Sequence, residues 1–98
     1  MAETDICLVE IGNRITERRK GLGWTQEELA EIVGVDKQHI SRIERGSRAC
    51  SIDLLVILAS TLHVSTDYLL MGKSFYFEPV REVLQKVIFE LQRLLQTM

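Results

Sequence analysis

A group of hydrogen-bond donors lies between positions 37 and 45, at the spacing of one helix face. If Ile40 and Ile43 point inward, the opposite side of the helix carries Gln38, Ser41, Arg42 and Arg45, with Lys37 on its flank. Arg can donate two hydrogen bonds to guanine and Gln can pair with adenine, while Ser, Lys and Arg can bind phosphate. A polar face on an isolated helix is more often only solvated, so the prediction depends on the elements around it.

The segment before these donors has the signals of a short helix. Thr25 is a good N-cap, and Glu28 three residues later completes a capping box. The small Ala30 permits the close approach of a second helix, and Gly34 can adopt the left-handed conformation that ends the first.

A second short helix is predicted directly after this turn. Asp36 is its expected N-cap, Ile40 and Ile43 form its buried stripe, and Gly46 can stop it. Two helices joined by about three residues are the pattern of a helix-turn-helix that binds DNA. Its base-contacting residues are predicted to be Lys37, Gln38, Ser41 and Arg42.

The charge of the chain restricts where nucleic acid could bind. With 98 residues and a net charge of -2, the chain can form one small domain plus an appendage, and it lacks a general basic surface. The positive charge is local, because Lys37, Arg42, Arg45 and Arg48 are opposed only by Glu44 between positions 37 and 48.

Other kinds of chemistry are not indicated. Cys7, Cys50, His39 and His63 have no metal-ligand spacing, so no metal, cofactor or disulfide is expected. No catalytic triad, carboxylate pair or glycine-rich phosphate loop is recognisable, which argues against an enzyme. There is no signal peptide and no run of about 18 apolar residues, so a cytoplasmic protein with no membrane contact is expected.

Three more helices are predicted to support the motif. Apolar residues recur at helical spacing from about position 5 to position 20. Ser51 can cap a helix that is apolar nearly all round, which predicts a place at the centre of the core. Ser65 can cap a short last helix that ends at Gly72.

One charged pair is predicted inside this scaffold. Glu44 projects within about 60° of the buried direction of its helix, and Arg19 has a similar place on the first helix. Each charge would be costly alone at the edge of the core, so we expect an ion pair that fixes the two helices together. The alternative is that both side chains are exposed.

Several motifs together carry a family resemblance. They are IleGlyAsnArgIle at 11–15, TrpThrGlnGluGluLeuAla at 24–30, IleSerArgIleGluArgGly at 40–46, IleAspLeuLeu at 52–55 and ValSerThrAspTyrLeuLeu at 64–70. Residues 11–72 thus resemble the Cro/CI-type (Xre-like) helix-turn-helix repressors. The resemblance implies an all-α fold, with a five-helix lambda-repressor-like domain that binds a DNA operator, usually as a dimer.

The resemblance also bears on individual residues. Gln26 matches a Gln that clamps phosphate in this family, and an Arg and a Glu at positions 19 and 44 commonly pair. The full set expected to bind phosphate is Thr25, Gln26, Arg45, Ser47 and Arg48. Arg18 stands where an apolar residue is frequent and Cys50 where Pro is frequent, so local packing is expected to differ there.

Residues 73–98 form a different kind of segment. Pro79 is well placed in the first turn of a helix whose apolar residues occupy a sector of about 140°. About 20 helical residues span roughly 30 Å, which is more than a five-helix core could cover. A second copy is expected to cover the rest, although the helix could instead fold back on its own domain. The predicted dimerisation residues are Val80, Leu84, Val87, Ile88, Leu91, Leu94 and Leu95.

These observations predict a DNA-binding domain at 1–72 and a dimerisation helix at 73–98. The chain is interpreted as a homodimeric transcriptional regulator, and in the first place as a repressor, that reads an inverted-repeat operator through the helix at 36–45. An antitoxin that controls its own operon, with a toxin or antirepressor as protein partner, is one alternative. Another is a protein-interaction adaptor that keeps only the fold.

Overall fold

The chain folds into six helices in the parts that the structure describes. The computed structural model covers residues 6–73 and 78–97, with side chains described from Val83 onward in the second range. The helices are α1 (Leu8–Gly21), α2 (Gln26–Val33), α3 (Lys37–Glu44), α4 (Ile52–Leu62), α5 (Thr66–Met71) and α6 (Glu78–Thr97). The all-α prediction is confirmed. None of the described helices is long and apolar enough to cross a membrane.

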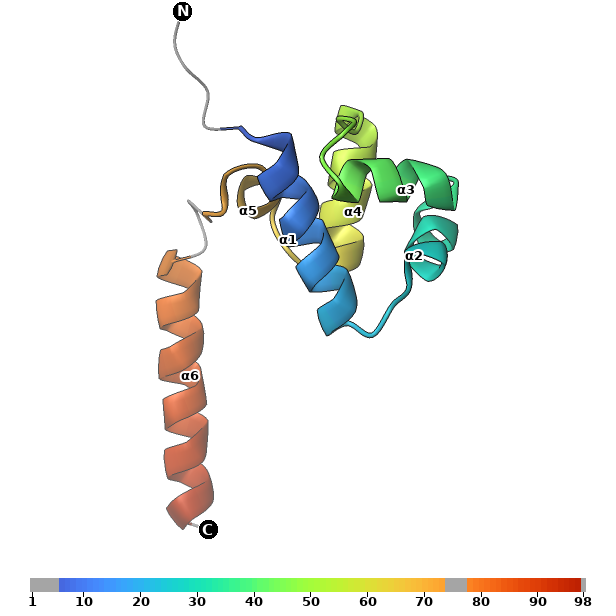
Figure 1. Cartoon of the computed structure of the whole chain (residues 1–98). Coiled ribbons are helices and arrows are strands. Elements are labelled where there is room, and N and C mark those ends of the chain that lie inside the picture. The colour runs from blue at the N-terminus through green and yellow to red at the C-terminus, as the bar shows by residue number, and fades with distance from the viewer. Residues whose placement is uncertain (1–5, 74–77, 98) are drawn as a thin grey trace, which may run out of the picture.

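Helices α1 to α5 form one body, and α6 extends away from it (Figure 1). The extensive helix contacts lie within this body, where α3 packs on α1 and α2, while α4 packs on α1, α2 and α5. The core is a single cluster of buried apolar side chains. Its members are Ile11, Ile15, Leu29, Ala30, Val33, Ile40, Ile43, Leu54, Leu58, Ala59, Leu62 and Leu69.

Helix α4, which is apolar nearly all round in sequence, contributes to the core from one side only. Leu58 and Leu62 are fully buried, but Ile52, Val56 and Ile57 are 81%, 53% and 44% exposed. Only one side of α4 meets other helices, since a body of five short helices has too few layers to cover both sides. The predicted place of α4 in the core therefore holds for one side, which supplies Leu54, Leu58, Ala59 and Leu62, while its other side faces solvent.

The helix ends mostly follow the local sequence signals. Ser51 and Ser65 accept hydrogen bonds from the third residues of α4 and α5, and Gly72 ends α5 in the left-handed conformation. At the start of α3, Asp36 has the extended backbone of an N-cap but makes no capping bond with its side chain. Helix α1 starts at Leu8, later than the predicted position 5.

Two arginines of α1 cap the carboxyl ends of other helices. Arg18 donates from Nε to the carbonyl of Leu62 at 2.6 Å, and Arg14 donates from Nη1 to the carbonyl of Leu69 at 3.0 Å. A cation at a helix carboxyl end binds orphan carbonyls and opposes the negative end of the dipole. Arg18 thus acts as a cap on the carboxyl end of α4.

Candidate nucleic-acid interface

The solvent face of α3 brings four of the predicted DNA-contacting side chains together. Ile40 and Ile43 are 0% and 2% exposed, and their burial fixes the rotation of the helix. On the outer side, one shallow depression is lined by Gln38, Ser41, Arg42 and Arg45. Lys37 is exposed at the first position of α3. This surface offers amide, hydroxyl and guanidinium donors over about two helical turns, which suits the edges of bases in a major groove.

The turn between α2 and α3 sets the angle at which this face is presented. The N–H groups of Gly34 and Val35 both donate to the carbonyl of Ala30, at 2.9 and 3.0 Å, and Gly34 has φ 81°. Ala30 is 3% exposed at the contact between the two helices. A small side chain allows the backbones to approach, and the positive φ reverses the chain without strain at glycine.

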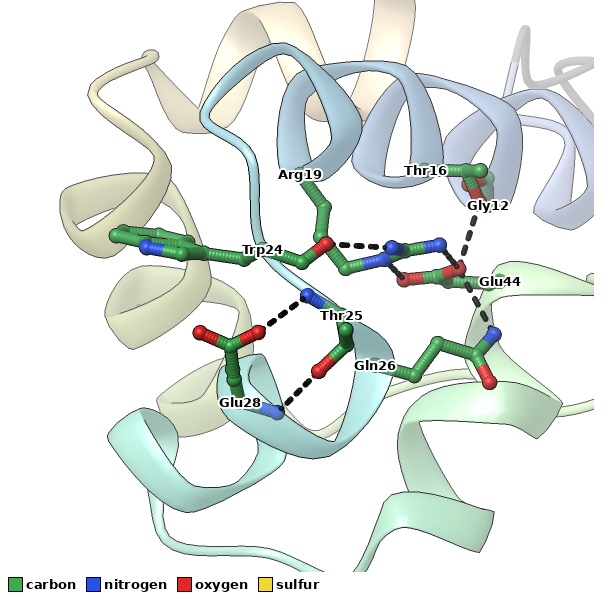
Figure 2. Close-up of polar contacts among 8 residues, drawn as sticks. All are labelled: Gly12, Thr16, Arg19, Trp24, Thr25, Gln26, Glu28 and Glu44. Carbon is green, nitrogen blue, oxygen red and sulfur yellow. Dashed lines mark hydrogen bonds and ion pairs between the residues drawn. The ribbon is translucent and has the colours of Figure 1, made fainter.

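The carboxylate of Glu44 is the polar centre that ties α3 to α1 and α2 (Figure 2). Arg19 donates two hydrogen bonds to it side-on, from Nε to Oε2 at 2.7 Å and from Nη2 to Oε1 at 3.0 Å. Oε1 also accepts hydrogen bonds from Thr16 Oγ1 at 2.9 Å and from Gln26 Nε2 at 3.0 Å. The remaining guanidinium nitrogen of Arg19 donates to the carbonyl of Trp24 at 2.7 Å. Three helices therefore meet on one carboxylate.

The environment of Glu44 favours its charged form. Burial raises the pKa of this carboxyl, but the hydrogen bonds from Arg19, Gln26 and Thr16 and the Arg19 charge outweigh it, so that the pKa is lowered overall. The side chains of Arg19 and Glu44 are 8% and 3% exposed. Among the described residues no buried side-chain nitrogen or oxygen lacks a hydrogen-bond partner, so this buried pair is fully satisfied.

The burial of Glu44 in its ion pair with Arg19 makes the solvent face of α3 more positive. The only acid between positions 37 and 48 is buried and neutralised by Arg19, so it does not offset the cations around it. Lys37, Arg42, Arg45 and Arg48 are all exposed to solvent. The face is thus a locally cationic surface on an acidic chain, which concentrates attraction for phosphate at one edge.

The residues predicted to bind phosphate differ in whether their side-chain hydrogens are already used in hydrogen bonds within the protein. Thr25 accepts the Glu28 N–H as half of the predicted capping box, which leaves its own hydroxyl proton available (Figure 2). Gln26 uses one amide hydrogen on Glu44 and, being half-buried, can still offer the other. Ser47 differs, because its hydroxyl donates to the Arg42 carbonyl at 3.1 Å and would have to release it to bind phosphate.

Sequence reasoning missed three parts of this site. Thr16 and the Trp24 carbonyl complete the Glu44 network, and neither has a pattern that identifies it in advance. Gly12 lies where α1 meets the last turn of α3, since a Cβ there would come 2.6 Å from the Ile43 carbonyl oxygen. A signal for Gly12 existed, because a glycine inside an amphipathic helix often marks close backbone approach.

A second surface lies on α6. The described apolar side chains of its stripe are all exposed, between 48% for Val87 and 70% for Leu95. The side chain of Val80, which belongs to the predicted set, lies outside the described part. The other members are Leu84, Ile88, Leu91 and Leu94. The stripe is therefore unoccupied by the rest of the described chain.

Known proteins resemble this chain in the region that contains the helix-turn-helix. A family model described as helix-turn-helix matches residues 15–69. The HTH-type transcriptional regulator ImmR of Bacillus subtilis is 34% identical over 82 residues, which are 84% of this chain and 65% of ImmR. The control protein C.SmaI of Serratia marcescens is 34% identical over 74 residues, covering 71% of this chain and 88% of C.SmaI.

A solved structure of a repressor also resembles this chain. The P22 c2 repressor, crystallised with a synthetic operator, matches with a TM-score of 0.63 and 40% identity over 64% of this chain and 96% of that chain. The family-model match at residues 15–69 contains α2 and α3, the two helices of the helix-turn-helix, together with α4.

Proposed function

Because this chain belongs to the helix-turn-helix family of DNA-binding transcriptional regulators, we propose that it is a repressor that binds an inverted-repeat operator as a homodimer. The observation that carries the proposal is the cationic outer face of α3, whose rotation is fixed by buried isoleucines and whose end is held by Glu44. A rigid helix with free donors on one side is what base readout in a major groove requires.

The contacts divide into two classes by position. Lys37, Gln38, Ser41 and Arg42 occupy the first turns of α3 and are assigned to base edges. Thr25, Gln26, Arg45 and Arg48 lie at its borders and are assigned to phosphates, with Ser47 a weaker member for the reason given above. Phosphate contacts give affinity and orientation, whereas base contacts give sequence preference.

Helix α6 is assigned to self-association. Burying a Leu or Val side chain is worth about 1.5–3 kcal/mol, so the exposed stripe supplies enough apolar surface to hold two chains together. In a two-fold symmetric dimer, the two α3 helices would need to lie about 34 Å apart to meet half-sites one DNA turn apart. The same stripe could hold a toxin or antirepressor helix, which is the basis of the antitoxin alternative.

Selection of bound duplexes from a random DNA library, at two salt concentrations, tests the proposal. We expect a palindromic consensus, and an affinity that falls steeply as salt rises, because phosphate contacts release counterions. Recovery of no preferred sequence at either salt concentration would contradict DNA readout and favour the adaptor alternative.

A truncated chain that ends at Lys73 tests the role of α6. The five-helix body keeps its whole described core, so we expect this chain to be folded and monomeric and to bind a full operator much more weakly than the intact chain. A truncated chain that associates as strongly as the intact one in sedimentation equilibrium would place the interface elsewhere.

A further inference from the structure

One oxygen of Glu44 has more hydrogen-bond donors around it than it has room to accept. A carboxylate has about four lone-pair sites, shared equally between its two oxygens. The side-on guanidinium of Arg19 occupies one site on each oxygen, which leaves a single site on Oε1. Thr16 Oγ1 at 2.9 Å and Gln26 Nε2 at 3.0 Å both lie within hydrogen-bond distance of Oε1. Thr16 and Gln26 therefore compete for one position on the carboxylate.

The hydroxyl of Thr16 has a second acceptor close by. Its Oγ1 lies 2.9 Å from the carbonyl oxygen of Gly12, which is the same distance as to Glu44 Oε1. A hydroxyl has a single hydrogen, so it donates to one acceptor at a time. The Gly12 carbonyl does not depend on this hydrogen, because inside α1 it already accepts a backbone N–H. The Thr16 hydroxyl can therefore rotate between the two acceptors without leaving the Gly12 carbonyl unsatisfied.

Gln26 differs from Thr16 in its place relative to the DNA-contacting face. It is the half-buried first residue of α2 and is assigned to a phosphate, whereas Thr16 belongs to α1 and approaches Glu44 from the opposite side (Figure 2). While the amide of Gln26 is bound to Glu44, one of its two hydrogens is available to a phosphate. An amide that turns outward offers both, but it takes a donor away from a buried carboxylate, which costs free energy if nothing replaces it.

Arg19 has no donor group left that could replace Gln26. Its Nε and Nη2 already bind Glu44, and its Nη1 donates to the Trp24 carbonyl at 2.7 Å. In the part of the chain that the structure describes, Arg19, Gln26 and Thr16 are the side chains that donate to Glu44. Thr16 is therefore the described side chain that can take the place of Gln26.

We propose that Thr16 is a positioning residue for DNA binding, which donates to Glu44 when Gln26 turns to a phosphate. In the free protein Gln26 donates to Glu44 Oε1 and the Thr16 hydroxyl donates to the Gly12 carbonyl. On DNA the hydroxyl rotates to Oε1, and the amide of Gln26 faces the phosphate. Glu44 keeps its full set of hydrogen bonds in both states, so α3 stays fixed while the phosphate contact forms. The inference rests on the proposed DNA binding and names a residue that acts through Gln26.

Thr16→Val tests this role, because it replaces the hydroxyl with a methyl group of similar size. Turning Gln26 outward then leaves Glu44 without one donor, so binding should weaken roughly five- to thirty-fold. The loss should be equal on the selected operator and on an unrelated duplex, since phosphate contacts carry no sequence information. The slope of log K against log salt should not change, because no charge is removed. The urea midpoint should change little, because Gln26 still donates to Glu44 in the free protein.

Two further variants serve as controls for Thr16→Val. Thr16→Ser keeps the hydroxyl and should restore binding. Thr61→Val is the matched control, because Thr61 is a half-buried threonine in α4 that takes no part in the Glu44 network, and it should leave binding unchanged. A Thr16→Val variant that binds both duplexes as tightly as the intact chain would overturn the proposal.

A double-mutant cycle with Gln26→Ala separates this role from a general effect on the fold. Gln26→Ala should weaken binding, and adding Thr16→Val should weaken it no further, because no amide remains to be released. Unfolding should show the opposite pattern, since either donor can serve Glu44 alone and the double variant should lose more stability than the two single variants combined. Effects that multiply in binding would overturn the proposal. An intact chain that binds no DNA would contradict the proposed function, whereas additive losses of stability in unfolding would overturn the exchange of donors by themselves.

Discussion

Gly12 of α1 lies directly against the backbone of Glu44 at the end of α3, with no room for a side chain between them. A Cβ on Gly12 would overlap the Glu44 carbonyl and approach the Ile43 carbonyl oxygen to 2.6 Å. Both neighbours are backbone atoms of the DNA-contacting helix, which cannot move away as a flexible side chain can. The absence of a Cβ at position 12 therefore sets how closely the two helices pack.

Replacing Gly12 should disturb this contact. Gly12→Ala should lower the free energy of unfolding by about 1–3 kcal/mol or more, because the extra methyl group forces α1 and α3 apart. Gly21→Ala is the matched control, since Gly21 is also in α1 and a Cβ added there would meet no atom within 4 Å. It should be neutral or raise stability by up to about 1 kcal/mol. Equal effects of the two changes in urea unfolding would contradict the close approach.

The free energy of unfolding should fall at acid pH because Glu44 becomes protonated. Its pKa is lowered from 4.5 in the folded state, so its contribution is present above pH 4.5 and is lost as the pH falls through the folded-state pKa. Glu44→Gln should cost about 3–5 kcal/mol at neutral pH, because Arg19 stays buried without its counter-charge, and should weaken the acid dependence.

Glu10→Gln is the control for this experiment. The side chain of Glu10 is 60% exposed in its 3.5 Å pair with Arg14, so its loss should change stability by less than about 0.5 kcal/mol. Chemical denaturation of both variants from about pH 7 down to about pH 3 makes the comparison. An unchanged acid dependence in Glu44→Gln would remove Glu44 as its source.

His63 carries a backbone conformation that suits glycine better. It ends α4 with φ 59°, the only positive φ among the described non-glycine residues. His63→Gly should raise the free energy of unfolding by up to about 1 kcal/mol, because glycine adopts this conformation without steric cost. Gly34→Ala tests the reverse, since Gly34 has φ 81° with open space around it, and it should be destabilising by a similar amount in thermal unfolding.

Two exposed arginines should have different effects on operator binding. Arg42→Ala should cost about 1–3 kcal/mol on the selected operator and relax the preference at one base pair, because Arg42 is assigned to a base edge. Arg48→Ala should weaken binding to all sequences alike and reduce the slope of log K against log salt by about 1. Titrations on matched and mismatched duplexes at several salt concentrations separate the two roles. Identical profiles for the two variants would contradict the division into base and phosphate contacts.

The amino-acid sequence by itself determined the features that depend on neighbouring residues. The Thr25–Glu28 capping box, the left-handed turn at Gly34 and the outward side of α3 all follow from side chains within a few positions of one another. The periodic burial of Ile40 and Ile43 was equally local. These are the features that carry the proposed DNA contacts, because a recognition helix is defined by its own caps and its own two faces.

Apart from the Arg19–Glu44 pair, only the tertiary structure decided which distant segments meet. Spacing along the chain does not reveal that Thr16 and Gln26 meet on the carboxylate of Glu44, or that Arg18 caps the end of α4. It also does not reveal that Ile52 and Val56 face solvent although α4 is apolar nearly all round. A helix wheel gives the direction of a side chain, but burial and hydrogen bonding depend on which other helix occupies that direction.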